Sequence, residues 1–266
     1  MRVLEIALND IEGIKELQPD GWPDITPHFD FYIRSSFCRA LKVVIDKRIV
    51  AIGAVVFHAN SAWLGHIITH KDFRNRGCGT FVTQSLLTII NARQFPTISL
   101  IATDAGEPVY QKLGFKKTSD YHFYKREECN TLFNALPQIR DLSLDLYDDV
   151  LKLDMLSSGE NRSNLLKAHL PGAKVYVDNG DVIGFYLPGL GEGLVVAKDE
   201  FAGTQLLSLS LSTRPFCALP EENVAACQFL VSHKFNYLKQ AARMSLGKDL
   251  AFKPKMLYRR IGGNLG

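Results

Sequence analysis

A glycine-rich stretch with two arginines contains the residue types in this chain that best suit chemistry. The first N–H groups of a helix lack internal partners and attract anions, and glycine lets a ligand approach the backbone closely. Arginine side chains add donors for phosphate oxygens. The stretch therefore predicts a phosphate-binding turn, and an ordinary strand-to-helix turn with solvated arginines is the alternative. It joins an apolar segment, 62–68, to a segment with helical apolar spacing, and it reads Arg74-Asn75-Arg76-Gly77-Cys78-Gly79-Thr80.

Two other phosphate-binding loops are excluded by residue type. A Walker loop needs Gly-Lys-Ser/Thr, which does not occur here, and a Rossmann fingerprint needs glycine where Val82 stands. The stretch instead matches the Arg-x-x-Gly-x-Gly pattern of the GNAT acyltransferases, which bind acetyl-CoA. Residues 102–115 resemble that family's later motif, a helix that ends in Tyr-x-x-x-Gly-Phe. The two motifs occur in the family's order, and the resemblance covers roughly residues 1–126.

The resemblance implies how acetyl-CoA, the co-substrate, would be held. The glycine-rich stretch would bind the pyrophosphate. The preceding strand would pair with the pantetheine arm through backbone groups, and one of its N–H groups would face the thioester oxygen. No metal is expected. The candidate cofactor-binding residues are Ile67, Ile68, Thr69, Arg74, Asn75, Arg76, Gly77, Cys78, Gly79 and Thr80.

Tyr110 and His66 are the candidate catalytic residues. Tyr110 matches the family's tyrosine four residues before Gly114, where its hydroxyl would approach the sulfur. A phenol with a pKa of about 10 is protonated at neutral pH and could donate to a thiolate. His66 lies two residues before Ile68 on the same strand face and could relay a proton from the amine. Packing roles for both residues, and a proton path through water, are the alternatives, and His70 could simply begin the loop.

Cys78 occupies the variable position of the phosphate-binding turn. We expect its thiol to lie against the bound pyrophosphate, with a thiolate fraction raised by the helix N-terminus. A covalent role is not expected, because no His–Asp pair is evident beside it and GNAT proteins transfer the acyl group directly.

The segment 20–37 is expected to form the wall of the acceptor site, because the early helices do so in GNAT proteins. It contains aromatic residues and carboxylates, which would suit a small cation. An ordinary core helix with a solvated face is the alternative. The aromatic residues are Trp22, Phe29, Phe31, Tyr32 and Phe37, and the carboxylates are Asp20, Asp24 and Asp30.

The apolar patterns of the first half predict the element order ααβββαβαβ, which is also the GNAT order. The fold class is α/β (α+β), with a mixed, mainly antiparallel central sheet flanked by helices. We expect helices at 11–17, 29–39, 79–92 and from Pro108 to a left-handed stop at Gly114, and strands at 41–45, 49–57, 62–68, 97–101 and 121–125.

The second half repeats the first in weaker form. A hairpin signal with an Asn-Gly turn at 175–186 parallels 43–54. A proline followed by a helix and a phenylalanine at 220–235 parallels 108–115. Chance likeness between common α/β patterns is the alternative to a true repeat.

The second copy lacks the phosphate-binding chemistry. Residues 197–203 have neither the arginines nor the glycine pair, and Asp199 and Glu200 would repel phosphate at the helix start. The chain thus resembles a tandem-GNAT subgroup whose C-terminal domain is degenerate, and we expect one CoA per chain. Further likeness to that subgroup lies in Asp154, in Gly159-Glu160-Asn161-Arg162 and in Arg243-Met244.

Composition limits the other classes of function. The formal net charge of +3 is too small to argue for a nucleic-acid partner, and no long apolar run predicts a membrane span. Five scattered cysteines, without Cys-x-x-Cys spacing, favour a reduced cytoplasmic protein.

These observations together predict a two-domain N-acetyltransferase. An N-terminal GNAT domain at 1–126 would transfer acetyl from acetyl-CoA to a primary amine by direct attack. A linker at 127–140 would lead to a degenerate GNAT-like domain at 141–266. The expected partner is a small-molecule amine, with no nucleic acid or membrane, and a homodimer is left open. The alternative is a non-catalytic acyl-CoA-binding or sensory module.

Overall fold

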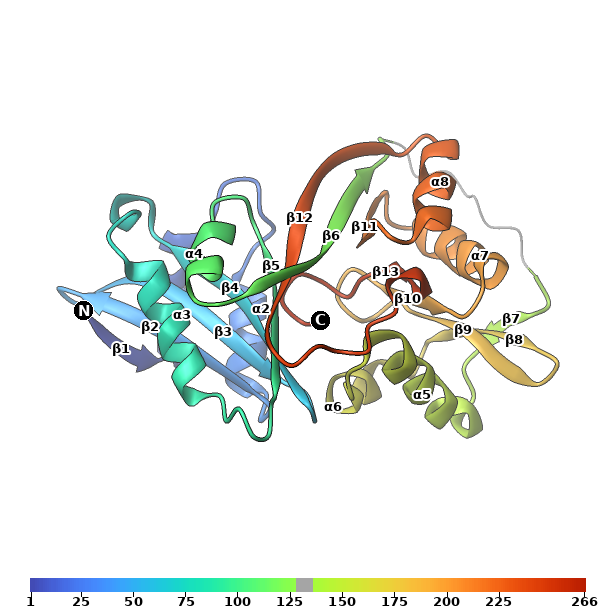
Figure 1. Ribbon diagram of the computed structural model, residues 1–266, viewed down its shortest axis with the longest axis horizontal. Helices are drawn as coiled ribbons and strands as arrows, with labels where there is room; N and C mark the ends of the chain where they lie inside the picture. The colour runs from blue at the N-terminus through green and yellow to red at the C-terminus, as the bar shows by residue number, and fades with distance from the viewer. Residues whose placement is uncertain (128–135) are drawn as a thin grey trace.

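The computed structural model describes residues 1–127 and 136–266, and it contains one mixed and one antiparallel sheet with helices packed on them (Figure 1). No helix in these two ranges is both long and apolar enough to cross a membrane. The first half contains β1 (Arg2–Glu5), α1 (Ile11–Ile14), α2 (Thr26–Arg34), β2 (Cys38–Ile45), β3 (Arg48–Phe57), β4 (Ser61–Thr69), α3 (Cys78–Ile89), β5 (Thr97–Ala102), α4 (Glu107–Lys112) and β6 (Lys116–Lys125).

The second half has a comparable run of elements. Its order from β8 to β12 repeats the order from β2 to β6, which supports the predicted internal repeat. The elements are β7 (Ile139–Asp141), α5 (Tyr147–Ser158), α6 (Ser163–Leu166), β8 (Lys174–Asp178), β9 (Asp181–Leu187), β10 (Leu194–Ala197), α7 (Glu200–Leu211), β11 (Phe216–Pro220), α8 (Val224–Ser232), β12 (Asn236–Gly247) and β13 (Leu257–Arg259).

The predicted α+β fold class is confirmed, and one predicted helix is misplaced. The helix expected at 29–39 is α2, which begins earlier and ends at Arg34. Cys38 pairs with Val56 of β3, so Cys38 and Arg39, which helical spacing had assigned to the predicted helix, belong to strand β2. Both predicted hairpins are present. Asp46 and Lys47 have φ values of 47° and 67°, and the Asn179-Gly180 turn also has left-handed φ at both positions, as type I′ turns require.

Strand β12 ties the two halves together. It lies between β5 and β6 in the eight-stranded sheet, whose order is β1-β2-β3-β4-β5-β12-β6-β11. Figure 1 shows this long strand from the second half beside β6 of the first. In return β6 lies between β12 and β11, both from the second half. The halves therefore exchange strands, and one sheet contains strands from both sides of the expected linker at 127–140. Residues 128–135 of that linker lie outside the described residues.

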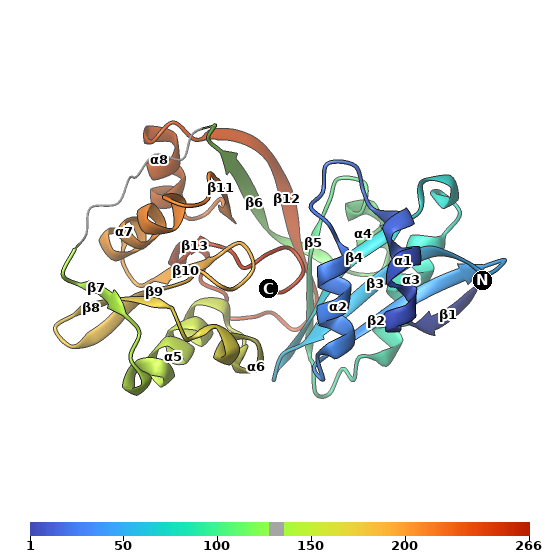
Figure 2. The same ribbon diagram turned by 180° about the vertical axis from the view of Figure 1, so that it is seen from behind.

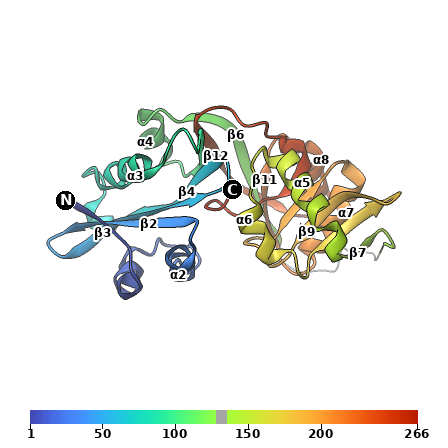
Figure 3. The ribbon, with the colours of Figure 1, turned by 90° about the horizontal axis from the view of Figure 1, so that it is seen from below.

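Helices cover both faces of the first half of this sheet. Figure 3 shows α3 and α4 on one side and α2 on the other, and Figure 2 shows α1 and α2 together in front of the strands. The α2 face shares one apolar core with the second half, which includes Phe29, Tyr32, Leu166 and Phe185. The α3 face has a separate core. The two sides of the sheet thus have different surroundings: one faces the second half, the other only its own helices.

Charged residues that the sequence singled out in the second half build the contact between halves. Glu160 accepts hydrogen bonds from Ser61 and, at 2.8 Å, from Trp63 Nε1. Arg162 is buried and pairs with Asp154, with Nε 3.0 Å from Oδ2. A buried charge with its partners removed is costly, so the bonds from Ser61 and Trp63 to Glu160 help to specify how the halves meet, whereas the Arg162–Asp154 pair lies within the second half.

The strand exchange predicts that the first half does not fold as a separate chain. Residues 1–127 alone would leave the facing edges of β5 and β6 unpaired. Each hydrogen bond exchanged for bonds to water costs about 0.5–1.5 kcal/mol, and many are lost, against a typical total stability of about 5–15 kcal/mol. We expect this fragment to show no cooperative thermal transition by circular dichroism.

A matched fusion restores the missing strand. Asn236 pairs with Lys125, so an Asn-Gly turn between these residues would join β6 directly to β12. The fusion of residues 1–125, the turn and 236–247 should unfold cooperatively. A fragment 1–127 that folds as well as this fusion would contradict the dependence on β12.

Candidate active site

Strands β4 and β5 separate from each other and leave a slot in the sheet. They run parallel and pair only from Ser61 to Trp63, opposite residues 97–99 of β5. Beyond Trp63, β4 continues to Thr69 with no strand partner on its β5 side among the described residues. β12 occupies the opposite edge of β5. The slot therefore presents unpaired backbone donors and acceptors to anything extended that enters it.

The predicted phosphate-binding turn lies beside the end of β4. Gly77 caps helix α3 with φ of 77°, no side chain caps this helix start, and a Cβ at Gly77 would meet nothing within 4 Å. A Cβ at Gly79 would lie 3.1 Å from Thr69 Oγ1, so the turn packs against the strand that leads to it. Free N–H groups, open space and the helix dipole make this an anion-binding geometry.

The arginines of the turn are available to a ligand. Arg74 and Arg76 are exposed, and neither forms an ion pair with a carboxylate in the described part of the chain. The Arg76 guanidinium carbon lies 5.3 Å from the centre of the Phe73 ring, which orients the side chain without neutralising its charge. Two unpaired cations beside an uncapped helix start fit a pyrophosphate.

The position of the Cys78 side chain contradicts one prediction from the sequence. Its thiol is 1% exposed and packs into the apolar core beside Met1, with the two sulfurs 3.8 Å apart. Cys78 shares a helix face with Val82 and Leu86, which are also buried, so the side chain points away from the turn. The prediction that the thiol lies against the pyrophosphate is wrong, and only the backbone of Cys78 remains a candidate for cofactor binding.

A β-bulge places His66 on the α2 side of the slot. Ile52 pairs with Ile68 and Ala54 with Gly65, so His66 and Ile67 together oppose one residue of β3. His66 takes a left-handed φ of 50°, as bulge residues can. The bulge sends Ile67 into the core under α3, whereas His66 contacts the aromatic residues of α2.

His66 is a neutral side chain in an aromatic enclosure. Its ring centre lies 4.6 Å from that of His28 and 5.8 Å from that of Phe29, and Trp22 stands at 6.3 Å. Burial, followed by repulsion from His28, lowers the pKa of His66 to about 3. Nδ1 lies 2.7 Å from the hydroxyl of Tyr32. His66 therefore carries no charge that would repel an incoming cation.

Tyr110 lies on the other side of the sheet. It belongs to the core under α3 and α4, is 7% exposed, and packs against Phe115 with ring centres 5.9 Å apart. Its hydroxyl has no hydrogen-bond partner within the described ranges, and burial raises its pKa above the usual value. The hydroxyl thus stays protonated. The slot separates this acid candidate, on the α3 and α4 side of the sheet, from His66 on the α2 side.

The expected acceptor wall is aromatic but not acidic around His66. Two of its three carboxylates are engaged locally: Asp24 accepts from Thr26, and Asp30 pairs with Arg34 at 2.9 Å.

His70 lies at the start of the loop that follows β4. It accepts a hydrogen bond from the backbone N–H of Asp72 and begins the loop, which was one of the alternatives for this residue.

Asn264 is a site residue that the sequence did not reveal. It donates to the Tyr32 hydroxyl at 2.6 Å. A Cβ at Gly65 would lie 2.5 Å from Asn264 Cβ, so the strand accepts this close approach only as glycine. A glycine inside a strand is a signal of close backbone approach, and Gly65 was the available hint.

The corresponding slot of the second half is filled by the chain itself. β13 pairs with β10, and Arg260 N donates to Ala218 O of β11 at 3.0 Å. At the start of α7, the Asp199 side chain accepts from Ala202 N at 2.8 Å, where an anion would otherwise bind. A Cβ at Gly203 would lie 2.1 Å from Tyr258 Cζ, so a tyrosine ring covers that helix start.

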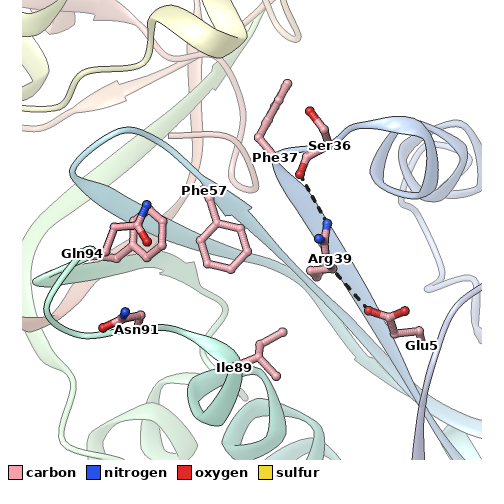
Figure 4. Close-up of a pocket in the computed structure, with 9 residues that line it drawn as sticks. Glu5, Ser36, Phe37, Arg39, Phe57, Ile89, Asn91 and Gln94 are labelled. Carbon is pink, nitrogen blue, oxygen red and sulfur yellow. Dashed lines mark hydrogen bonds and ion pairs between the residues drawn. The ribbon is translucent and has the colours of Figure 1, made fainter.

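A shallow hollow of about 400 Å³ lies elsewhere, near the C-terminal end of α3 (Figure 4). Its lining includes the aromatic rings of Phe37 and Phe57. Its charged residues, Glu5 and Arg39, are paired with each other at 3.8 Å. Nothing in this hollow suits acyl transfer.

Comparison with known proteins agrees with this geometry. Residues 33–127 match the family described as acetyltransferase (GNAT) domain. The uncharacterized N-acetyltransferase YitH of Bacillus subtilis is 22% identical over 205 residues, which cover 71% of this chain and 70% of that protein.

Two crystal structures share the fold of nearly the whole chain. A presumed acetyltransferase from Pyrococcus horikoshii superposes with a TM-score of 0.84 at 22% identity, covering 100% of this chain and 95% of the other. A GCN5-related N-acetyltransferase from Sphaerobacter thermophilus gives 0.65 at 14% identity, covering 95% and 98%. The first superposition therefore extends over both sheets.

The open space at Gly77 predicts that a larger side chain at this position would weaken CoA binding without unfolding the protein. Gly77→Val would fill the open space above the helix start, and CoA affinity measured by calorimetry should fall at least tenfold, or by about 1.4 kcal/mol. Gly172→Val is the matched control, because Gly172 also has a left-handed φ and open space around its missing Cβ. Both variants carry the same backbone strain, but only Gly77→Val should lose affinity. Equal affinities in the two folded variants would contradict the assignment.

Proposed function

We propose that this GNAT-family acetyltransferase, whose residues 33–127 match the family, uses its first half to move an acetyl group from acetyl-CoA to a primary amine by direct attack. The observation that carries this proposal is the slot between β4 and β5, with the uncapped start of α3 at its open end. An extended arm with amide groups could pair in the slot while its phosphates bind the helix start.

The co-substrate would be held by backbone more than by side chains. The unpaired edge of β4 at Ile67, Ile68 and Thr69 would bond the pantetheine amides. The turn from Arg74 to Thr80 would hold the pyrophosphate through N–H groups and the two guanidinium groups. A backbone N–H beside the bulge would stabilise the oxyanion, because fixed donors cost no reorganisation during the reaction.

The chemistry needs two proton movements on opposite sides of the sheet. The neutral amine attacks the thioester carbon, a C–N bond forms and the C–S bond breaks. Tyr110, kept protonated by burial, would give its proton to the departing sulfur. The proton that the amine loses would leave on the acceptor side, through His66 or through water. The aromatic enclosure around His66 would limit the access of bulk water to the reacting groups and leave a narrow water path for the proton.

The second half is proposed to be a degenerate GNAT-like copy, which makes the chain a tandem protein. Its repeat of element order supports this origin. Its slot is filled by β13, and its helix start is occupied by Asp199. One CoA per chain follows. The second half would instead help to form the acceptor side of the first slot, since both share one apolar core.

A non-catalytic acyl-CoA-binding or sensory module is the second candidate. The observation that favours it is the low pKa of His66, which makes this residue a weak base. Release of free thiol from acetyl-CoA, measured with amino acids, polyamines, amino sugars and peptide N-termini, separates the two. Binding without turnover across this panel would favour the module. A small-molecule amine as the acceptor and a cytoplasmic location stay predictions, and a homodimer stays open.

Tyr110→Phe tests the mechanism and not the binding. The variant keeps the ring and loses only the hydroxyl, so kcat should fall by roughly 10²-fold while CoA affinity is retained, as expected for an interaction made only in the transition state. Tyr258→Phe, the same change in the filled slot, should retain kcat. A single-turnover rate of Tyr110→Phe equal to wild type would remove Tyr110 from the catalytic residues.

A further inference from the structure

Three side chains from distant parts of the sequence form a hydrogen-bonded series that ends at His66. Asn264 Nδ2 lies 2.6 Å from the hydroxyl oxygen of Tyr32, and that oxygen lies 2.7 Å from His66 Nδ1. Tyr32 is 1% exposed and Asn264 is 9% exposed. Both side chains are therefore shielded from solvent, so their polar atoms depend on one another for hydrogen-bond partners.

The segment after β13 brings Asn264 to this place. Asn264 lies against Gly65 of β4, and a Cβ at the preceding residue, Gly263, would lie 3.7 Å from Ile101 Cβ of β5. His58 Nε2 lies 3.1 Å from the backbone oxygen of Leu265. In Figures 1 and 3 the end of the described chain lies between the two halves. The segment 261–266 thus crosses β4 and β5 on the acceptor side of the slot.

The direction of the series decides which nitrogen of His66 carries the hydrogen. The Asn264 amide donates to Tyr32, so the Tyr32 oxygen is already an acceptor. Its own hydrogen has one acceptor within the described ranges, His66 Nδ1. Nδ1 must then be unprotonated, and a neutral imidazole carries its hydrogen on Nε2. Nε2 has no hydrogen-bond partner within those ranges and is left for a ligand.

We propose that Asn264 is a positioning residue that, through Tyr32, holds His66 with its hydrogen on Nε2, so that His66 donates a hydrogen bond to the acceptor substrate instead of removing its proton. The role toward the acceptor rests on the function proposed above; the tautomer does not. The favoured acceptor carries an oxygen, carbonyl or carboxylate, near its amine. The amine's proton then leaves through water.

The surroundings of His66 agree with a neutral donor. The titratable groups that face it are His28 and Tyr32, both from α2, and neither is an anion. No carboxylate in the described part of the chain contacts the ring, so nothing there stabilises an imidazolium. A neutral histidine that polarises an oxygen is an established catalytic device on other folds.

Asn264→Asp reverses the series and is the decisive variant. A carboxylate can only accept, so the Tyr32 hydrogen would turn toward the new carboxylate, and the Tyr32 oxygen would accept from His66 Nδ1–H. The hydrogen of His66 would move to Nδ1 and leave Nε2 unprotonated, so that Nε2 could act as a base. Asn164→Asp is the matched control, because Asn164 also bonds across the halves, to Phe57 O at 2.7 Å, but lies outside the series.

Nitrogen-15 NMR of the imidazole reads the tautomer directly and needs no turnover. Wild type and Asn164→Asp should show His66 with a protonated Nε2 and a bare Nδ1, and Asn264→Asp should show the reverse. Wild-type protein with hydrogen on Nδ1 would overturn the proposal. So would an Asn264→Asp variant that is folded and keeps the wild-type tautomer.

Turnover tests the role toward the acceptor. Wild-type kcat/KM should follow the ionisation of the amine, with no inflection from a histidine. Asn264→Asp should lower kcat roughly tenfold or more, keep CoA affinity, and introduce a histidine inflection. A wild-type histidine inflection, or loss of CoA binding together with kcat, would overturn the donor role. Absence of turnover with every amine would count against the proposed function, while the NMR result would still decide the tautomer.

Discussion

Hydrogen bonding at strand edges is the constraint on which this structure depends. A buried edge needs a partner, because each backbone group left without one costs about 1–3 kcal/mol. β12 meets that need for β5 and β6, and β13 meets it for β10. The stretch of β4 beyond Trp63 is left without a strand partner on its β5 side in the described structure. That open edge is what an extended ligand would complete, and the uncapped start of α3 lies beside its end.

The two halves show opposite outcomes of one architecture. At α3 the helix start is exposed and flanked by unpaired arginines, whereas at α7 Asp199 bonds the free N–H group and Tyr258 covers the turn. One segment of chain links these outcomes. It fills the second slot as β13 and then reaches the first slot, where Asn264 contacts Tyr32. The filled slot of the second half and the Asn264 contact at the first slot therefore depend on the same segment, 257–266.

Features set by local chemistry could be predicted from the sequence. The left-handed Gly77 and the Asn179-Gly180 turn follow from backbone preferences that act within a few residues. The inward thiol of Cys78 was also predictable, because Val82 lies four residues further along the same helix face. The pairing of β12 with β5 joins segments far apart in the chain, and no local pattern encodes it. Asn264 reaches the site through that same long-range packing.

The stoichiometry of CoA binding tests the central claim most directly. If the open edge of β4 makes the binding site and β13 has closed the other, an equilibrium titration by calorimetry should saturate at one CoA per chain. Gly77→Val should then remove that single binding event. Two CoA molecules per chain, or one that persists with unchanged affinity in folded Gly77→Val, would contradict the claim that the first slot alone holds the co-substrate.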